Sequence, residues 1–180
     1  MKLIILDRDG VINEDSDNFI RSVQEWIPIP GSLPAIARLN SLGYTVAVAT
    51  NQSGIARGYF DTAALEAMHD YMRGQLAVLG GRIDALEYCP HGPDDGCDCR
   101  KPRPGMLMNI ARQFGVPPAR ILTVGDSLRD YQAAQAAGMR YAQVRTGKGL
   151  RTLASGELPA TVPVFGNLAE LVEQLAGAAA

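Results

Sequence analysis

The chain has 180 residues, of which 47% are hydrophobic and 20% charged. This length allows one sizeable core, and this composition excludes a disordered or low-complexity chain. The formal net charge of -2 excludes a broad basic field for nucleic acid or an anionic membrane surface.

No apolar run approaches the roughly 20 residues that span a bilayer. The stretch from Met1 to Asp7 is too short for the apolar region of a signal peptide. We therefore expect one cytoplasmic domain over residues 1–180. No segment has the pattern of an exposed interface helix, so a monomer that contacts neither membrane nor nucleic acid is the default expectation.

Short apolar strands and amphipathic helices alternate along the chain, which is typical of an α/β fold. We expect a three-layer α/β/α Rossmann-like sandwich with a mostly parallel sheet and no large cap domain. Asp61 is a candidate helix cap, and residues 177–180 are expected to fray. The expected elements in chain order are strand 2–6, helix 31–42, strand 44–50, helix 61–79, strand 83–88, helix 104–115, strand 121–125, a helix ending at 137, strands 141–144 and 162–165, and helix 167–175.

Two segments, residues 13–30 and 89–103, do not fit a regular element. Long irregular loops in a compact domain are often functional. In an open α/β sheet, ligands bind beyond the carboxyl ends of the strands. Both segments follow predicted strands, so we expect them to border the binding site.

Polar residues follow the first two predicted strands. Asp7 and Asp9 lie in Asp-Arg-Asp-Gly, and two close carboxylates favour a cation and can divide nucleophilic attack from proton transfer. Taken alone, the motif fits an ordinary turn equally well. Thr50 begins Thr-Asn-Gln-Ser-Gly, whose hydroxyl and backbone N–H groups can bind an anion, although an ordinary polar loop is the simpler interpretation.

Two more clusters come later in the chain. Arg100 and Lys101 suit phosphate oxygens, or are a solvated charged pair. Asp126 ends the fourth strand, and Asp130 lies one helical turn further on. Oxygen ligands at separate strand ends suit Mg²⁺, with Asp130 placed to orient Lys101 or the metal shell. The alternative is that Asp126 and Ser127 only cap the next helix.

The loop 89–101 contains Cys89, His91, Cys97 and Cys99 in the pattern Cys-x-His-x5-Cys-x-Cys. Three thiolates and one imidazole are the ligand set of a closed structural Zn²⁺ site. An odd number of cysteines in a reducing compartment argues against disulfides. We expect zinc to clamp this loop just before Arg100 and Lys101; the alternative is three free or buried thiols beside a surface histidine.

In order and placement, the four clusters resemble those of the haloacid dehalogenase-like phosphatases, over residues 3 to 146. The resemblance implies that Asp7 attacks phosphorus and forms an aspartyl-phosphate, and that Asp9 acts as the general acid and base. It also implies that Mg²⁺ lies between the Asp7 carboxylate, the Asp9 backbone carbonyl and Asp126. Thr50 and Lys101 would neutralise the transferring phosphoryl group.

The zinc loop is similar to that of one subgroup, the heptose bisphosphate phosphatases of lipopolysaccharide precursor synthesis. Cys-Pro-His, Cys-Asp-Cys-Arg-Lys-Pro and Pro-Gly-Met carry this similarity. It implies removal of the 7-phosphate of D-glycero-D-manno-heptose 1,7-bisphosphate. The stretch between His91 and Cys97 is shorter than in the subgroup, which leaves the anomer open. The alternatives are a histidinol-phosphate phosphatase, a non-catalytic zinc-stabilised binding module and, remotely, a polynucleotide 3′-phosphatase.

Substrate contacts are expected from three loops, residues 13–26, 53–60 and 89–103, because no cap insertion is present. A solvated loop is nearly as good an interpretation of residues 15–18. His69 has no partner motif and is interpreted as an ordinary helix histidine, and Trp26 is expected to pack the first loop. The predicted substrate-binding residues are Asp15, Asp17, Asn18, Asn51, Gln52, Ser53, Arg57, Arg100 and Lys101.

Overall fold

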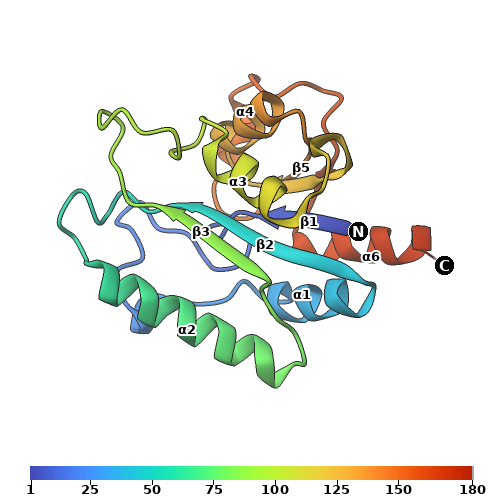
Figure 1. Ribbon diagram of the computed structural model, residues 1–180, viewed down its shortest axis with the longest axis horizontal. Coiled ribbons are helices and arrows are strands. Elements are labelled where there is room, and N and C mark those ends of the chain that lie inside the picture. Colours follow the sequence, from blue (N-terminus) through green and yellow to red (C-terminus); the bar gives the residue numbers. More distant parts are fainter. Residues whose placement is uncertain (180) are drawn as a thin grey trace.

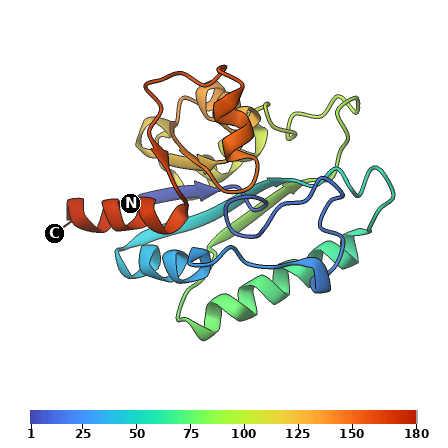
Figure 2. The ribbon, with the colours of Figure 1, turned by 180° about the vertical axis from the view of Figure 1, so that it is seen from behind.

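Six parallel strands form the centre of the protein, and helices cover both faces of the sheet (Figure 1, Figure 2). The structure is a computed structural model that describes residues 1–179. The strand order is β3-β2-β1-β4-β5-β6. The strands are β1 (Lys2–Leu6), β2 (Tyr44–Asn51), β3 (Ala85–Cys89), β4 (Leu122–Gly125), β5 (Arg140–Val144) and β6 (Val164–Phe165). The helices are α1 (Ser32–Ser41), α2 (Thr62–Val78), α3 (Gly105–Phe114), α4 (Leu128–Ala137), α5 (Gly149–Ala154) and α6 (Leu168–Ala179), with short 3-10 turns η1 (Val23–Glu25) and η2 (Pro118–Arg120).

The predicted alternation of strands and helices is confirmed, and the sheet is fully parallel. Asp61 caps α2, because its carboxylate accepts a hydrogen bond from the Ala64 N–H. Several element ends are shifted by one or two residues, and η1 and η2 were not expected. Two larger differences concern α5 and the end of α6. Helix α5 was not predicted, since it is only six residues long and opens on glycine. The expected fraying of residues 177–179 is wrong, because α6 continues to Ala179; residue 180 lies outside the described residues.

Alternate residues of β1 point to opposite faces, as the pleat of a strand requires. Ile4 and Leu6 pack with buried residues of α1, α2 and α6, while Leu3 and Ile5 pack with those of α3 and α4. Both faces of this strand are therefore buried, which explains its continuous apolar run. The loop after β1 also contributes to the core: Trp26 is 3% exposed, which confirms its predicted packing role.

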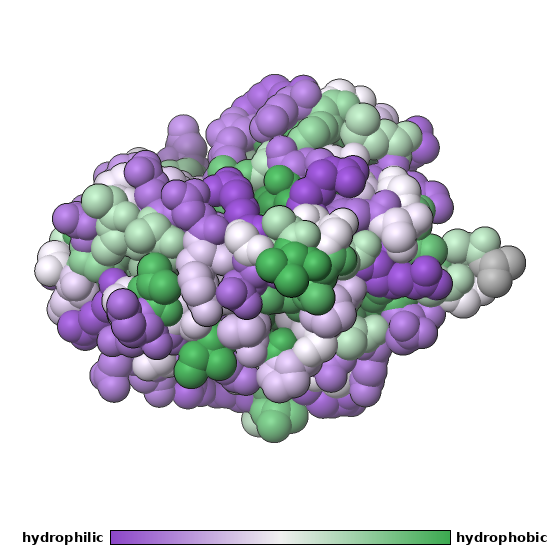
Figure 3. All heavy atoms as spheres, turned by 90° about the horizontal axis from the view of Figure 1, so that it is seen from below, coloured by the Kyte–Doolittle hydropathy of each residue, from purple (hydrophilic) through white to green (hydrophobic). Residues whose placement is uncertain are grey.

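The surface seen from below is mostly hydrophilic, with hydrophobic patches separated by polar residues (Figure 3). Scattered exposed apolar residues are normal for a globular protein. Within residues 1–179, none of the helices combines the length and the hydropathy that a bilayer-spanning segment requires.

Candidate active site

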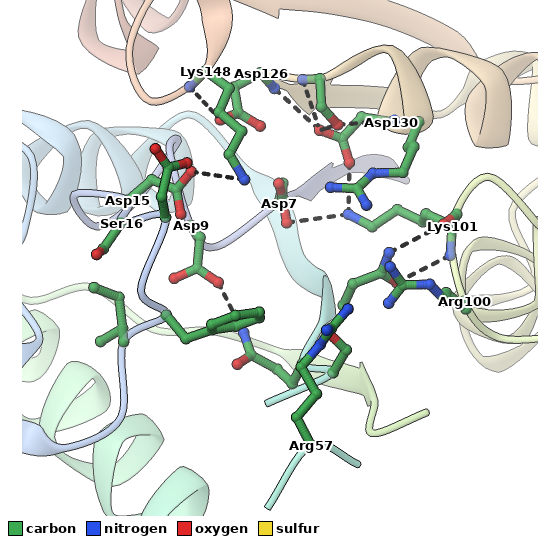
Figure 4. Close-up of a pocket in the computed structure, with 18 residues that line it drawn as sticks. Asp7, Asp9, Asp15, Ser16, Arg57, Arg100, Lys101, Asp126, Asp130 and Lys148 are labelled. Carbon is green, nitrogen blue, oxygen red and sulfur yellow. Dashed lines mark hydrogen bonds and ion pairs between the residues drawn. The ribbon is translucent and has the colours of Figure 1, made fainter. Parts of the chain in front are cut away.

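The carboxyl ends of the central strands meet at one edge of the sheet and surround a cavity of about 210 Å³ (Figure 4). Asp7 follows β1, Asp126 follows β4, and Lys101 enters from the loop that follows β3. Strand β1 lies between β2 and β4, so Asp7 lies where the chain turns from one half of the sheet to the other. This is the position at which open α/β sheets bind ligands.

Lys101 joins two of the carboxylates. Its Nζ lies 3.1 Å from Asp7 Oδ1 and 2.7 Å from Asp130 Oδ1, and it donates a third hydrogen bond of 2.8 Å to the Ala49 carbonyl. Burial acts to lower the pKa of Lys101, but Asp130 and Asp7 outweigh it and raise that pKa above its usual value. Lys101 is therefore a fixed positive charge beside Asp7.

Asp130 is also tied to the start of α4. Its Oδ2 accepts hydrogen bonds from the backbone N–H groups of Asp126 and Ser127, each 3.1 Å long, and from the Ser127 hydroxyl at 2.9 Å. Ser127 and Asp130 together form a capping box. The capping alternative and the orienting role are thus both present: Ser127 caps the helix, while Asp130 orients Lys101.

Asp126 lies against two glycines that bring the backbone close to it. A Cβ atom added to Gly10 or Gly147 would lie 2.0 or 2.3 Å from Asp126 Oδ2, and both glycines have positive φ. Asp126 Oδ2 also accepts a hydrogen bond of 2.8 Å from the Lys148 N–H. These contacts fix the carboxylate at the cavity wall.

Asp9 is held by three donors. Its Oδ1 accepts from Arg8 Nη2 and Asn13 Nδ2, and its Oδ2 accepts from Gln52 Nε2, all at 2.9 Å. Burial acts to raise the pKa of Asp9, but the Arg8 guanidinium and the hydrogen bonds from Asn13 and Gln52 leave that pKa lowered. Asp7 and Asp9 both line the cavity, as the motif predicted.

The other three carboxylates, of Asp7, Asp126 and Asp130, carry more negative charge than Lys101 alone can compensate. Burial and the neighbouring Asp130 raise the pKa of Asp7 to about 7, against the lowering effect of Lys101. Burial, Asp7 and Asp130 raise the pKa of Asp126 well above its usual value. Carboxylate oxygens of Asp7, Asp126 and Asp130 lie within 4.8 Å of one another. Because a hard cation would keep these groups ionised, the donor set fits Mg²⁺. Asp130 is already saturated by Lys101 and the α4 cap, so Asp7 and Asp126 are the better ligands.

Thr50 is not among the residues that line the cavity. Its side chain is fully buried, and its hydroxyl accepts a 2.9 Å hydrogen bond from Gln52 Nε2. Its contact with a phosphoryl group therefore stays a prediction. The next residue, Asn51, fastens the loops together: its side chain makes two hydrogen bonds, of 3.1 and 3.0 Å, with the Lys101 carbonyl and N–H.

Most of the predicted substrate-binding residues line the cavity, and Asn18 does not. Several lining residues were not predicted. Arg129 lies three positions after Asp126, on the first turn of α4. This closeness to a predicted site residue could have identified Arg129 as a lining residue. No sequence signal pointed to Lys148, because no structure was predicted for its segment. Its Nζ forms an ion pair with Asp15 Oδ2 at 3.3 Å. The other unpredicted lining residues are Ser16, Phe19, Ile20 and Ser127.

The predicted zinc ligands come together at the start of the loop after β3. The three Sγ atoms and one His91 ring nitrogen lie within 4.8 Å of one another. Cys89 Sγ lies 3.7 Å from Cys97 Sγ, and His91 Nδ1 lies 3.5 and 3.3 Å from the Sγ atoms of Cys89 and Cys99. A tetrahedral ion with Zn–S bonds of about 2.3 Å places its sulfurs about 3.8 Å apart. These separations fit zinc, although the Cys89 to Cys99 distance of 2.8 Å is shorter.

Comparison with known proteins agrees with this geometry. The HAD-hydrolase-like family matches residues 98–171. The chain is 59% identical to the D-glycero-beta-D-manno-heptose-1,7-bisphosphate 7-phosphatase of Bordetella bronchiseptica, over 97% of this chain and 98% of the relative. It is 57% identical to the enzyme of the same name from Pseudomonas aeruginosa, over 96% and 97%.

Solved structures give the same result. The D,D-heptose 1,7-bisphosphate phosphatase from B. bronchiseptica, complexed with magnesium and phosphate, superposes with a TM-score of 0.96 at 58% identity, covering 99% of both chains. The D,D-heptose 1,7-bisphosphate phosphatase from Burkholderia thailandensis has a TM-score of 0.77 at 46% identity, covering 98% of this chain and 99% of the other.

Proposed function

Because the chain belongs to the family of the heptose-1,7-bisphosphate 7-phosphatases, which are haloacid dehalogenase-like hydrolases, we propose that it hydrolyses the 7-phosphate of D-glycero-β-D-manno-heptose 1,7-bisphosphate. The convergence of Asp7, Lys101 and Asp126 on one cavity carries this proposal. The β anomer, which the sequence motifs left open, is the one in the relatives' names. The reaction would be a step in making the heptose precursor of lipopolysaccharide.

Mg²⁺ is the proposed catalytic cofactor, held by the carboxylates of Asp7 and Asp126 and the backbone carbonyl of Asp9. The crowding of buried carboxylates supports it, as does the magnesium bound in the B. bronchiseptica structure. When bound, the ion supplies charge that lets an anionic nucleophile approach an anionic phosphate.

The side chains then divide the reaction between them. An Asp7 oxygen attacks phosphorus, the bond from phosphorus to the sugar oxygen breaks, and Asp9 gives a proton to that oxygen. This leaves an aspartyl-phosphate on Asp7. Because the pKa of Asp9 is lowered in the free site, Asp9 has to take up that proton when the anionic substrate binds. In the second half, Asp9 takes a proton from the water that attacks phosphorus, the phosphorus bond to Asp7 breaks, and inorganic phosphate leaves. Lys101 neutralises charge on the phosphoryl oxygens, and we assign Thr50 a supporting part through Gln52.

A bisphosphate carries a second anion that needs its own partners. Arg57, Arg100 and Arg129 all line the cavity, and guanidinium groups suit phosphate. We assign the 1-phosphate to this arginine rim. Sugar hydroxyls are assigned to three other polar lining residues, Asp15, Asp17 and Ser53.

Zn²⁺ is the proposed structural cofactor, with Cys89, His91, Cys97 and Cys99 as ligands. The four ligand positions support it, and no ligand position is left over for a reacting water. The last ligand, Cys99, directly precedes Arg100 and Lys101, so a bound zinc ion would hold the backbone that positions these two cations. A single domain, a cytoplasmic location and a monomeric state remain parts of this proposal.

A turnover panel with Mg²⁺ tests the function. The β-heptose 1,7-bisphosphate, its α anomer, hexose phosphates and histidinol phosphate are compared by phosphate release, with Asp7→Asn as the inactive control. We expect the β-heptose bisphosphate to exceed the hexose phosphates by roughly 10² or more in kcat/KM. Equal rates on all substrates, or preference for histidinol phosphate, would contradict the assignment. Activity retained by Asp7→Asn would contradict the nucleophile, and an inactive wild type would favour a non-catalytic binding module.

A further inference from the structure

Arg8, between the two aspartates of the first motif, is fully buried at 0% exposure. A buried guanidinium is costly unless acceptors surround it. Its Nη2 donates to Asp9 Oδ1 at 2.9 Å, and its Nη1 lies 3.1 Å from His69 Nε2. Its Nε has no partner in residues 1–179. Arg8 thus depends on two acceptors, one of which is the proposed general acid and base.

His69 supplies the other acceptor from α2, which lies on the α1/α6 side of the sheet (Figure 1). It is 3% exposed and does not line the cavity. Because a guanidinium can only donate, His69 Nε2 must accept, so the ring is the neutral tautomer with its proton on Nδ1. Burial and the positive charge of Arg8 lower the pKa of His69 to about 3, which agrees with a neutral ring.

We propose that His69 is a positioning residue of the phosphatase: it fixes the Arg8 guanidinium, which in turn fixes the Asp9 carboxylate for proton transfer. This inference rests on the proposed function, since it assigns Asp9 its role. His69 touches neither substrate nor Asp9. It acts only through Arg8, along a continuous chain of two hydrogen bonds.

A choice of leaving group can distinguish the positioning role of His69 from a merely structural role in folding. Asp9 gives a proton to a sugar alkoxide in the first half-reaction and takes one from water in the second. A p-nitrophenolate leaving group needs no proton, so formation of the aspartyl-phosphate from p-nitrophenyl phosphate does not require a well-placed Asp9. Hydrolysis of the aspartyl-phosphate still does.

Two variants of similar size test whether the hydrogen-bond acceptor at position 69 is what matters. His69→Leu removes the acceptor, whereas His69→Gln places an amide oxygen near the position of Nε2. We expect His69→Leu to lower kcat on the sugar phosphate by roughly ten- to hundredfold, a part of the 10²–10⁴ that general acid–base catalysis supplies, with KM changed by less than about threefold because His69 lies outside the cavity. His69→Gln should recover most of the lost kcat.

Rapid-mixing kinetics with p-nitrophenyl phosphate give the decisive measurement. For His69→Leu we expect a burst near one equivalent of p-nitrophenolate at close to the wild-type rate, followed by slow turnover with accumulated phosphoenzyme. Circular dichroism and magnesium titration of each variant check that fold and metal binding persist. If the burst slows as much as sugar phosphate turnover, or if Leu and Gln variants behave alike, the inference is overturned.

The comparison does not depend on the identity of the natural substrate. It can be made on any alkyl phosphomonoester that the wild-type protein hydrolyses. Failure of the heptose assignment would appear in the substrate preference of the wild type. Failure of the positioning role would appear only in the comparison of the wild type with the His69 variants.

Discussion

Replacing His69 with glutamine should change how the stability of the folded protein depends on pH. In the native structure the pKa of His69 is about 3, because burial and Arg8 oppose its charged form, whereas an unfolded chain has a histidine pKa of about 6.5. Between these values the unfolded state binds one more proton than the native state. Stability from this site is therefore complete above about pH 6.5 and is lost as pH falls toward 3. The loss is about 1.4 kcal/mol per pH unit, so at pH 4.5 it reaches about 3 kcal/mol.

The assay is urea unfolding of the wild type and of His69→Gln at pH 7.5, 6.5, 5.5 and 4.5, with tryptophan fluorescence as the signal. Carboxylates and thiols that titrate over this range are present in both proteins, so they cancel in the difference between the two unfolding free energies. That difference should move by about 3 kcal/mol in favour of His69→Gln between pH 7.5 and 4.5. A difference that stays flat over this range would refute the neutral, buried histidine.

Three further changes test the site. Lys101→Met leaves the Asp7 and Asp130 charges without their cation. We expect kcat/KM to fall by roughly 10³ and the free energy of unfolding, measured in urea, to fall by about 3–5 kcal/mol; full activity would contradict the role of Lys101. Cys97→Ser should lower the zinc content measured by mass spectrometry from one ion per chain and lower the thermal midpoint by about 5 °C or more, roughly 2 kcal/mol for a domain of this size; an unchanged midpoint would argue against the clamp. Gly147→Ala puts a methyl group against the Asp126 carboxylate and should raise the Mg²⁺ concentration for half-maximal activity about tenfold or more. The control Gly156→Ala is also at positive φ but in open space, so it should affect only stability; an equal rise in the Mg²⁺ requirement of both variants would contradict the steric argument.

Much of the fold was predictable because it rests on local patterns. The buried strand β1 is a continuous apolar run, and Asp61 caps α2 as its position before that helix predicted. The sequence could not predict α5, because a helix of six residues that opens on glycine has no periodic signal. It also underestimated α6, whose alanine-rich end continues to Ala179.

The site was predictable where a residue follows a strand directly, as Asp7 and Asp126 do. Residues that reach the site through tertiary packing and lie in no recognisable motif were not. Lys148 reaches the cavity only because the segment after β5 folds back toward Asp15. His69 was interpreted as an ordinary helix residue, since no local pattern reports that its helix lies opposite Arg8. Thr50 does not line the cavity, because its buried hydroxyl is hydrogen-bonded to Gln52.

The two hydrogen-bonding roles of Asp130 limit which substitutions this protein can accept. One of its oxygens closes the amino end of α4 and the other grips Lys101, so a single side chain serves both folding and charge placement. A mutational scan scored only for abundance and one scored only for turnover should each find position 130 intolerant. An evolutionary path that replaces Asp130 therefore has to rebuild the start of α4 and the support of Lys101 in the same step, which narrows the sequences that such a path can cross.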